Sequence, residues 1–162
     1  MGRLLEDHVA VVAQHGLRTN KAAVLGGTLS VAGAITATGG LLRQVESVSA
    51  AKTVTAAMSG RMFVDVQGAA TTVFTLPAAA AGLTYTFVAG HADGEILINP
   101  AAGDAIVTKI HAAQDGTALA PAAGTGIKNT AATNVAGDSI TLTALDGTTW
   151  YGTALIGLWA SQ

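Results

Sequence analysis

The chain has 162 residues, enough for one ordinary domain or for a small domain with an attached arm. A net charge of −2, with eight scattered basic residues, argues against nucleic-acid binding, which needs clustered Lys and Arg. The lack of cysteine excludes disulfides and thiolate chemistry, and no apolar run approaches the roughly 18 residues of a membrane span.

Small residues dominate the composition, at the expense of large apolar and charged side chains. Hydrophobic residues make up 50% of the chain, but aromatic residues make up only 4% and charged residues 11%. Alanine buries little apolar surface, and each Å² contributes only about 25 cal/mol. We therefore expect a thin core and a chain that gains stability from neighbouring subunits.

Residues 1–20 are predicted to form an N-terminal arm. A short helix here would gather four apolar residues loosely on one side, namely Leu4, Leu5, Val9 and Val12. Helices of this length are marginal in water when isolated. We therefore expect the arm to become ordered only against a partner.

Residues 21–48 carry a six-residue repeat marked by Gly27, Gly33 and Gly39. Apolar and hydroxyl residues alternate between the glycines, which is the period of a β-strand. Two units are too few to bury a core alone, because repeat folds need about three or more. The segment is then either a β-repeat completed by sister chains, used for attachment, or two ordinary strands with glycine turns. Together with the thin core, it predicts a homotrimer.

Residues 49–162 are predicted to form one all-β domain, an antiparallel sandwich or barrel. Short β-branched runs alternate there with Gly, Pro, Asn and Asp, a pattern typical of such folds. Asp146-Gly147 predicts a hairpin with a type I′ turn, which needs positive φ at both central positions. Residues 112–133 have few large side chains and are predicted to be a loop. The expected strands are 53–57, 62–66, 72–76, 84–88, 95–99, 105–108, 139–145, 148–152 and 154–159.

The sequence contains none of the common catalytic motifs: it has no cysteine nucleophile, P-loop, GxSxG or HExxH. The best metal candidate is the sequence HADGE, because an extended strand would place His91, Asp93 and Glu95 on one face. Gly94 favours instead a polar loop between two strands. No two carboxylates are recognisably paired for glycoside cleavage. We therefore expect neither an enzyme nor a cofactor.

Four residues of the C-terminal domain are predicted to have structural roles. Asp104 and Asp138 each follow a glycine just before a strand. We expect the glycine to supply an unusual backbone angle and the carboxylate to hold the turn by accepting hydrogen bonds from nearby backbone amides. Trp150 and Trp159, together with Tyr151, supply the bulk that the alanines cannot. We expect both tryptophans to be buried.

Three stretches of this domain resemble known proteins when they are taken together. They are TTVFTLP followed by GLTYTFV within 71–88, ILINPAAGDAI at 96–106, and GDSITL, DG and WY followed by GLW within 137–159. Their order resembles β-domains of phage and prophage virion proteins, which include capsid decoration (cement) proteins, head fibres and tail-fibre segments. The resemblance covers roughly residues 60–160 and rests on scaffold motifs.

The resemblance implies a place on a virus particle. The leading hypothesis is a homotrimeric decoration protein that is made in the host cytoplasm, binds the major capsid protein on the outside of the mature head and stabilises it. The short chain fits this high-copy role. A second hypothesis is a head-fibre or tail-fibre tip that binds a host receptor, which the glycine repeat favours. A third, a small cell-wall or polysaccharide depolymerase, is disfavoured by the missing catalytic residues.

Overall fold

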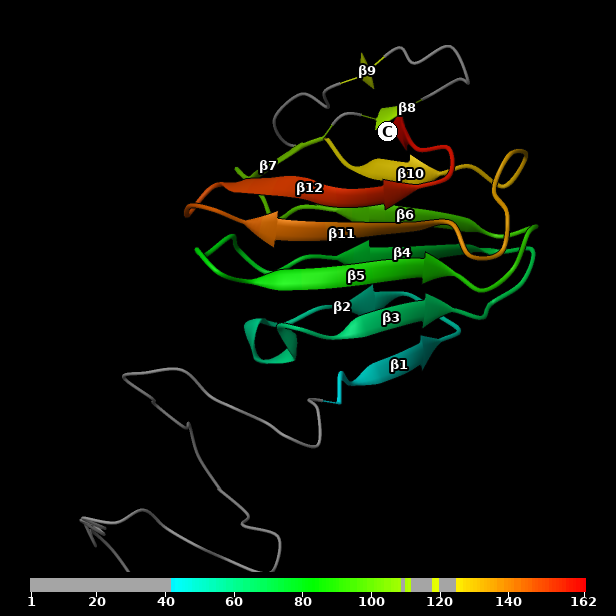
Figure 1. The fold of residues 1–162 in the computed structure, drawn as a ribbon, viewed down its shortest axis with the longest axis horizontal. Helices are drawn as coiled ribbons and strands as arrows, with labels where there is room; N and C mark the ends of the chain where they lie inside the picture. Colours follow the sequence, from blue (N-terminus) through cyan, green and yellow to red (C-terminus); the bar gives the residue numbers. More distant parts are fainter. Residues whose placement is uncertain (1–41, 109, 112–117, 120–124) are drawn as a thin grey trace, which may run out of the picture. The chain divides into compact units, whose positions relative to one another are not determined.

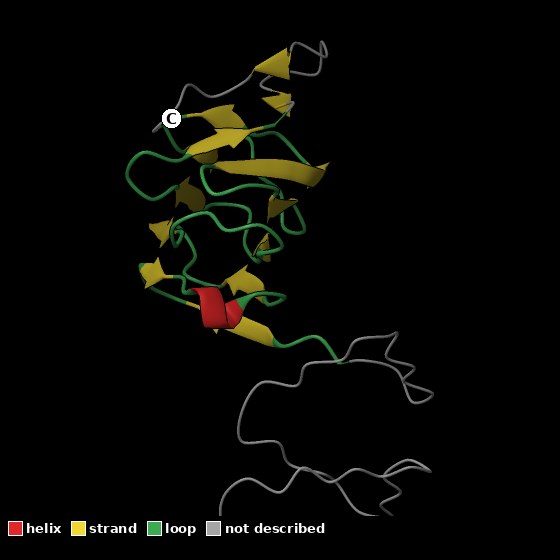
Figure 2. Cartoon of the chain, turned by 90° about the vertical axis from the view of Figure 1, so that its left-hand side faces the viewer, coloured by secondary structure: helices red, strands yellow, loops and turns green. Residues whose placement is uncertain are grey.

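The computed structural model describes residues 42–108, 110–111, 118–119 and 125–162. These residues form two β-sheets that face each other, so the predicted all-β, sandwich-like fold is confirmed (Figure 1). The only helical segment among them is one 3₁₀ turn, η1 (Ala56–Met58), drawn in red in Figure 2. Gly27, Gly33 and Gly39 lie outside the described residues, as do the predicted arm and most of the predicted repeat.

Sheet A has six strands and sheet B has five. In spatial order, sheet A contains β1 (Val45–Val48), β3 (Met62–Asp65), β5 (Thr84–Ala89), β11 (Ser139–Ala144), β12 (Thr149–Ile156) and β7 (Ala105–Val107). Sheet B contains β13 (Ala160–Ser161), β10 (Ile127–Asn129), β6 (Glu95–Asn99), β4 (Thr71–Thr75) and β2 (Lys52–Thr53). A separate pair joins β8 (Ile110–His111) and β9 (Ala118–Leu119).

The first six strands alternate between the sheets, so the chain climbs as a stack of rungs. Each rung is one strand of sheet A followed by one of sheet B: β1 and β2, then β3 and β4, then β5 and β6. Because the chain passes through the other sheet between neighbours, successive strands within a sheet run parallel. The prediction of an antiparallel domain is therefore wrong for this half.

The second half of the chain completes the stack mostly with antiparallel pairs, although β7 runs parallel to β12 at the edge of sheet A. β11 pairs with β5 and β12 in sheet A, and β10 pairs with β6 and β13 in sheet B. Because β9 and β10 lie inside the predicted loop 112–133, that prediction is wrong at 118–119 and 127–129, where each strand has only one large apolar residue and so gave too little signal. The predicted strands 148–152 and 154–159 are one strand up to Ile156, with a bulge in its pairing with β11.

Two further predicted segments differ from the structure by more than one residue. The predicted strand 53–57 is reduced to the two residues of β2 and is followed by the 3₁₀ turn. β1 pairs with β3, so residues 45–48 lie in sheet A and not in the attachment segment to which the sequence assigned them. Val48 is buried at its end.

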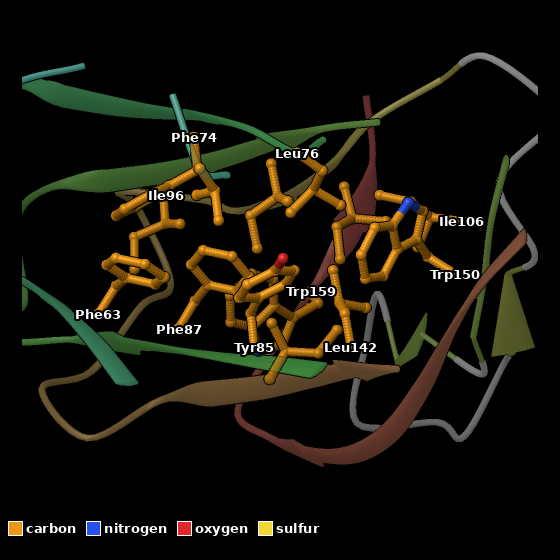
Figure 3. Close-up of a cluster of buried hydrophobic side chains, with 14 of the residues drawn as sticks. Phe63, Phe74, Leu76, Tyr85, Phe87, Ile96, Ile106, Leu142, Trp150 and Trp159 are labelled. Atoms are coloured by element: carbon orange, nitrogen blue, oxygen red, sulfur yellow. The ribbon is translucent and has the colours of Figure 1, made fainter. Parts of the chain in front are cut away.

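The core between the sheets is aromatic and branched rather than alanine-rich (Figure 3). Phe63, Phe74 and Phe87 pack around one another, with ring centroids 4.9–5.9 Å apart. Tyr85 packs on Trp150 at 5.5 Å. The expectation of a thin core is thus wrong for the described domain, because six of the seven aromatic side chains are buried. Strand alternation directs five of them inward, and Trp159 lies just before β13. The seventh, Tyr151, is only half-buried.

The β11–β12 hairpin is confirmed, but its turn is longer than predicted. The last paired residues are Ala144 and Trp150, so five residues separate them. Gly147 does not have positive φ, which excludes the type I′ turn. Instead one carboxylate oxygen of Asp146 accepts the backbone N–H groups of Thr148 and Thr149, at 2.8 and 2.7 Å. These hydrogen bonds lower the pKa of the Asp146 carboxyl.

Candidate functional site

The first rung is an open end of the stack. Within the described residues, β1 pairs only with β3, and β2 pairs only with β4. The carbonyls of Gln44 and Val48 accept hydrogen bonds from the β3 side, at 3.0 and 2.8 Å. Backbone groups of alternate residues point to opposite sides of a strand, so those of Val45 and Ser47 point away from β3. This edge can accept a further strand.

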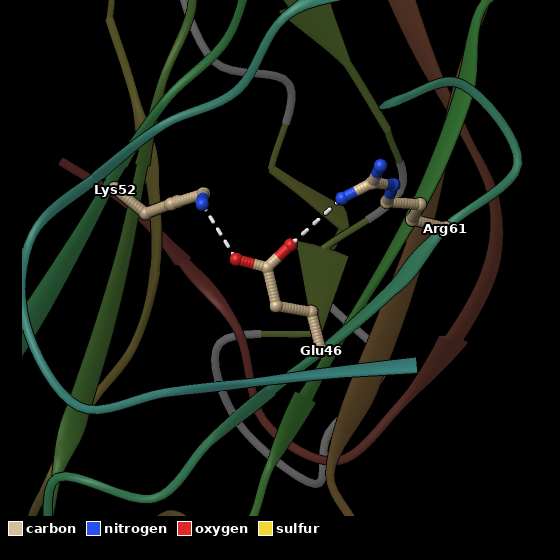
Figure 4. A network of polar contacts seen from close by, with 3 residues as sticks. All are labelled: Glu46, Lys52 and Arg61. Carbon is tan, nitrogen blue, oxygen red and sulfur yellow. Dashed lines mark hydrogen bonds and ion pairs between the residues drawn. The ribbon is translucent and has the colours of Figure 1, made fainter. Parts of the chain in front are cut away.

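A charged network closes the space between the sheets at this end (Figure 4). The Glu46 carboxylate lies 2.5 Å from the Lys52 ammonium and 3.1 Å from the Arg61 guanidinium. Glu46 is on β1 and Lys52 is on β2, so the ion pair links the two sheets across the first rung. Inward-pointing charges of this kind limit indiscriminate pairing at a sheet edge. The hydrogen bond from Lys52, assisted by Arg61, lowers the pKa of the Glu46 carboxyl from its ordinary value of 4.5.

The sign of this pKa shift predicts how the first rung responds to acid. A carboxyl whose pKa is lowered by folding adds stability above its unfolded pKa and loses it as pH falls through the folded pKa. Glu46→Gln should therefore cost up to about 1 kcal/mol at neutral pH, as a partly exposed ion pair does, and almost nothing near pH 3. Urea unfolding at both pH values measures this difference.

Glu95→Gln is the matched control, because Glu95 makes no ion pair among the described residues. A Glu46→Gln cost that is unchanged in acid would contradict an electrostatic role for the network.

Arg43 fixes the chain where it enters the first rung. Its guanidinium donates hydrogen bonds to the carbonyls of Gly60 and Arg61, at 2.6 and 3.3 Å, and to the Thr86 hydroxyl at 2.7 Å. One side chain therefore joins the residues before β1 to the second and third rungs. Any shortened chain that is meant to fold must keep it.

The predicted metal candidates do not form a cluster. His91 and Asp93 are exposed in the β5–β6 loop, and Glu95 is the first residue of β6. No three His, Asp or Glu side chains gather at metal-binding distance within the described residues. The loop is held through its backbone instead, because the buried Asn134 amide donates to the carbonyls of His91 and Gly94.

Asp104 and Asp138 are buried anchors of the scaffold. The glycine before each of them has positive φ, as the sequence predicted. Asp138 accepts the nearby Val135 N–H at 3.0 Å and the Asn129 side-chain amide at 3.0 Å. Asp104 instead accepts the N–H of Ala79, 25 residues away, at 2.7 Å. The expectation of a purely local turn contact is therefore wrong for Asp104.

The predicted burial of both tryptophans is confirmed. Trp150 is fully buried on β12, and Trp159 is 1% exposed just before β13. The Trp159 indole N–H donates to the Ile156 carbonyl at 3.0 Å. Both side chains belong to the core and neither lines a binding site.

Comparison with known protein families and curated proteins identifies no relative of this chain. The chain matches no model of a protein family, and a search of curated proteins finds no significant similarity. The described residues include no helix with the length and hydropathy of a membrane span. They also enclose no pocket.

The first rung could not be predicted from the sequence, because the spacing of Glu46, Lys52 and Arg61 along the chain matches no known pattern.

Proposed function

We propose that the chain is a structural protein of a virus particle: a homotrimeric decoration protein that binds the outside of a mature tailed-phage head. It acts by binding, not by catalysis. The observation that carries the proposal is the open edge of the first rung, a preformed site for strand addition. The proposal that this site belongs to a virus particle rests on the likeness of the chain's scaffold motifs to those of virion β-domains.

In this proposal, attachment uses the first rung and the residues before it. A coat-protein strand that pairs with the free side of β1 would satisfy the backbone groups of Val45 and Ser47. Binding to the mature shell alone then stabilises it by mass action, in proportion to RT ln(1 + [L]/Kd). The shell is thereby held against the pressure of packed DNA.

The test is a chain that starts at Leu42. It keeps Arg43 and all of β1. We expect the shortened chain to fold, with the tryptophan emission of the full chain, and to bind undecorated heads at least tenfold more weakly in co-sedimentation. A shortened chain that saturates heads with full-length affinity would show that the residues before Leu42 are not needed. Attachment through the first rung would be overturned if a Ser47→Pro variant, which removes an N–H from the free side of β1, also bound with full affinity.

A fibre tip that binds a host receptor is the second candidate. The stacked parallel rungs favour it, because rungs of this kind can be repeated along a stem. Copy number in purified particles separates the two. Hundreds of copies per particle support decoration, and a handful support a fibre.

A further inference from the structure

Two Asp-Gly pairs lie in loops of the described domain: Asp93-Gly94 between β5 and β6, and Asp146-Gly147 between β11 and β12. An aspartate that precedes a glycine can isomerise, because glycine has no Cβ to hinder the approach of its own backbone nitrogen to the aspartate side chain. The sequence alone does not distinguish the two pairs. A third pair, Asp115-Gly116, lies outside the described residues.

This isomerisation needs only the chain and water. The glycine nitrogen attacks the side-chain carbon Cγ of the protonated aspartate and forms a C–N bond, while the carboxyl hydroxyl leaves as water with the proton of that nitrogen. The product is a cyclic succinimide. Water then breaks one of the two C–N bonds of the ring. One opening restores aspartate, and the other gives isoaspartate, in which the main chain runs through the side-chain carbons. No oxidation or reduction takes place.

The turn that contains Asp146-Gly147 leaves both reacting groups accessible. Residues 145–148 are exposed, and the Gly147 N–H has no hydrogen-bond partner among the described residues. No other atom lies within 4 Å of the position that a Cβ of Gly147 would take. The Gly147 backbone can therefore turn toward the Asp146 side chain without a clash.

One carboxylate oxygen of Asp146 is held where negative charge develops during the attack. Its Oδ1 accepts the N–H groups of Thr148 and Thr149, at 2.8 and 2.7 Å. When the Gly147 nitrogen adds to Cγ, one carboxyl oxygen gains negative charge and the other becomes the leaving group. Two N–H donors aimed at Oδ1 stabilise that charge, as in an oxyanion hole, so that Oδ2 is the oxygen that departs.

The backbone at Asp93-Gly94 is restrained instead. Gly94 is buried, and its carbonyl accepts the side-chain amide of Asn134. A Cβ on Gly94 would overlap the carbonyl of Gly68, so the two backbones are in close contact. Turning the Gly94 nitrogen toward the Asp93 carboxyl would break these contacts. A segment held in this way has to open locally before it can react.

We propose that Asp146 is a site of spontaneous isomerisation to isoaspartate and that the fold protects Asp93 from the same reaction. Isoaspartate at position 146 lengthens the main chain of the turn by one carbon atom. Since the Thr148 carbonyl accepts the N–H of Ala105 at 2.9 Å, the longer turn disturbs the junction of β7 with sheet A. The inference does not depend on the proposed function.

The experiment stores the folded full-length chain for weeks in mildly acidic buffer, where more of the carboxyl is protonated. Isoaspartate at each position is then measured by peptide mapping with electron-transfer fragmentation. The same chain in guanidinium chloride is the matched control, because unfolding releases both pairs from their surroundings. Gly147→Ala is the second control, since it places a methyl group beside the attacking nitrogen in a turn that has room for it.

We expect at least about tenfold more isoaspartate at Asp146 than at Asp93 in the folded chain, because only the Asp93 segment must first open. In guanidinium chloride the two positions should react alike, and Gly147→Ala should remove most of the isoaspartate at Asp146. Similar amounts at both positions in the folded chain would overturn the protection of Asp93. An Asp146 that reacts only in guanidinium chloride would overturn the site, because the hydrogen bonds from Thr148 and Thr149 would then be protective. A difference that persists in guanidinium chloride would come from the neighbouring residues and not from the fold, and would also overturn the proposal.

Discussion

Trp150→Ala is expected to lower the free energy of unfolding by about 3–5 kcal/mol, the cost of removing a large aromatic side chain from a packed core. Trp150 is fully buried, packs on Tyr85, and lies opposite Ile106 of β7. Its loss would leave a cavity where the edge strand β7 joins sheet A. Urea unfolding followed by circular dichroism measures the change.

Trp150→Phe separates the contribution of aromatic packing from the cost of the buried, unpaired indole N–H at the same site. The indole N–H of Trp150 is buried and has no hydrogen-bond partner, which is itself unfavourable by about 1–3 kcal/mol. Phenylalanine keeps the aromatic contact with Tyr85 and removes this donor. We expect Trp150→Phe to lose less than half as much stability as Trp150→Ala. Equal losses would mean that the indole has a partner in solution, such as a bound water.

Gly157→Ala should be strongly destabilising, because it combines backbone strain with a steric overlap. Gly157 has a φ of +88°, where an L side chain is strained by about 1–2 kcal/mol. A Cβ atom there would also overlap the carboxylate of Asp138, which is buried and holds Val135 and Asn129. We expect a loss of at least about 3 kcal/mol, since strain and a disrupted buried network add.

Two other glycines resolve this loss into its parts. Gly82 has a φ of +91° with open space around it, so Gly82→Ala should report the backbone strain alone. Gly147 has neither positive φ nor a close neighbour, so Gly147→Ala should be nearly neutral. If Gly157→Ala costs no more than Gly82→Ala, the Asp138 carboxylate moves aside freely and is not a rigid anchor.

Much of the strand content was predictable because strand periodicity is local. The run from Glu95 to Asn99 was predicted to the residue, since Ile96 and Ile98 alternate with partly exposed neighbours. The same local periodicity marked Thr84–Ala89 within one residue, and the burial of Trp150 followed from the bulk of its side chain in a chain rich in small residues. The glycines before Asp104 and Asp138 were assigned correctly because positive φ is a local requirement.

What failed depends on contacts that no local pattern records. Parallel and antiparallel pairing follow from the path of the chain between strands, and a short β-branched run is compatible with either. β10 is paired on both sides in sheet B but has one large apolar residue, Ile127, which its neighbours bury. Glu46 meets Lys52 and Arg61 only because two sheets end at the same rung. Which residues share the outer face of sheet A can be known only once the order and orientation of its strands are known.

The order of strands in the two sheets also determines when each strand edge can become paired during translation. β5 and β6 acquire their outer neighbours, β11 and β10, only after the ribosome has added the later half of the domain. Thr84 and Thr143, which face each other across β5 and β11, are 59 residues apart. At 5–20 residues per second, the gap takes roughly 3–12 s to translate. For that interval a nascent chain carries two unpaired strand edges, so edge-to-edge pairing between nascent copies on neighbouring ribosomes competes with folding.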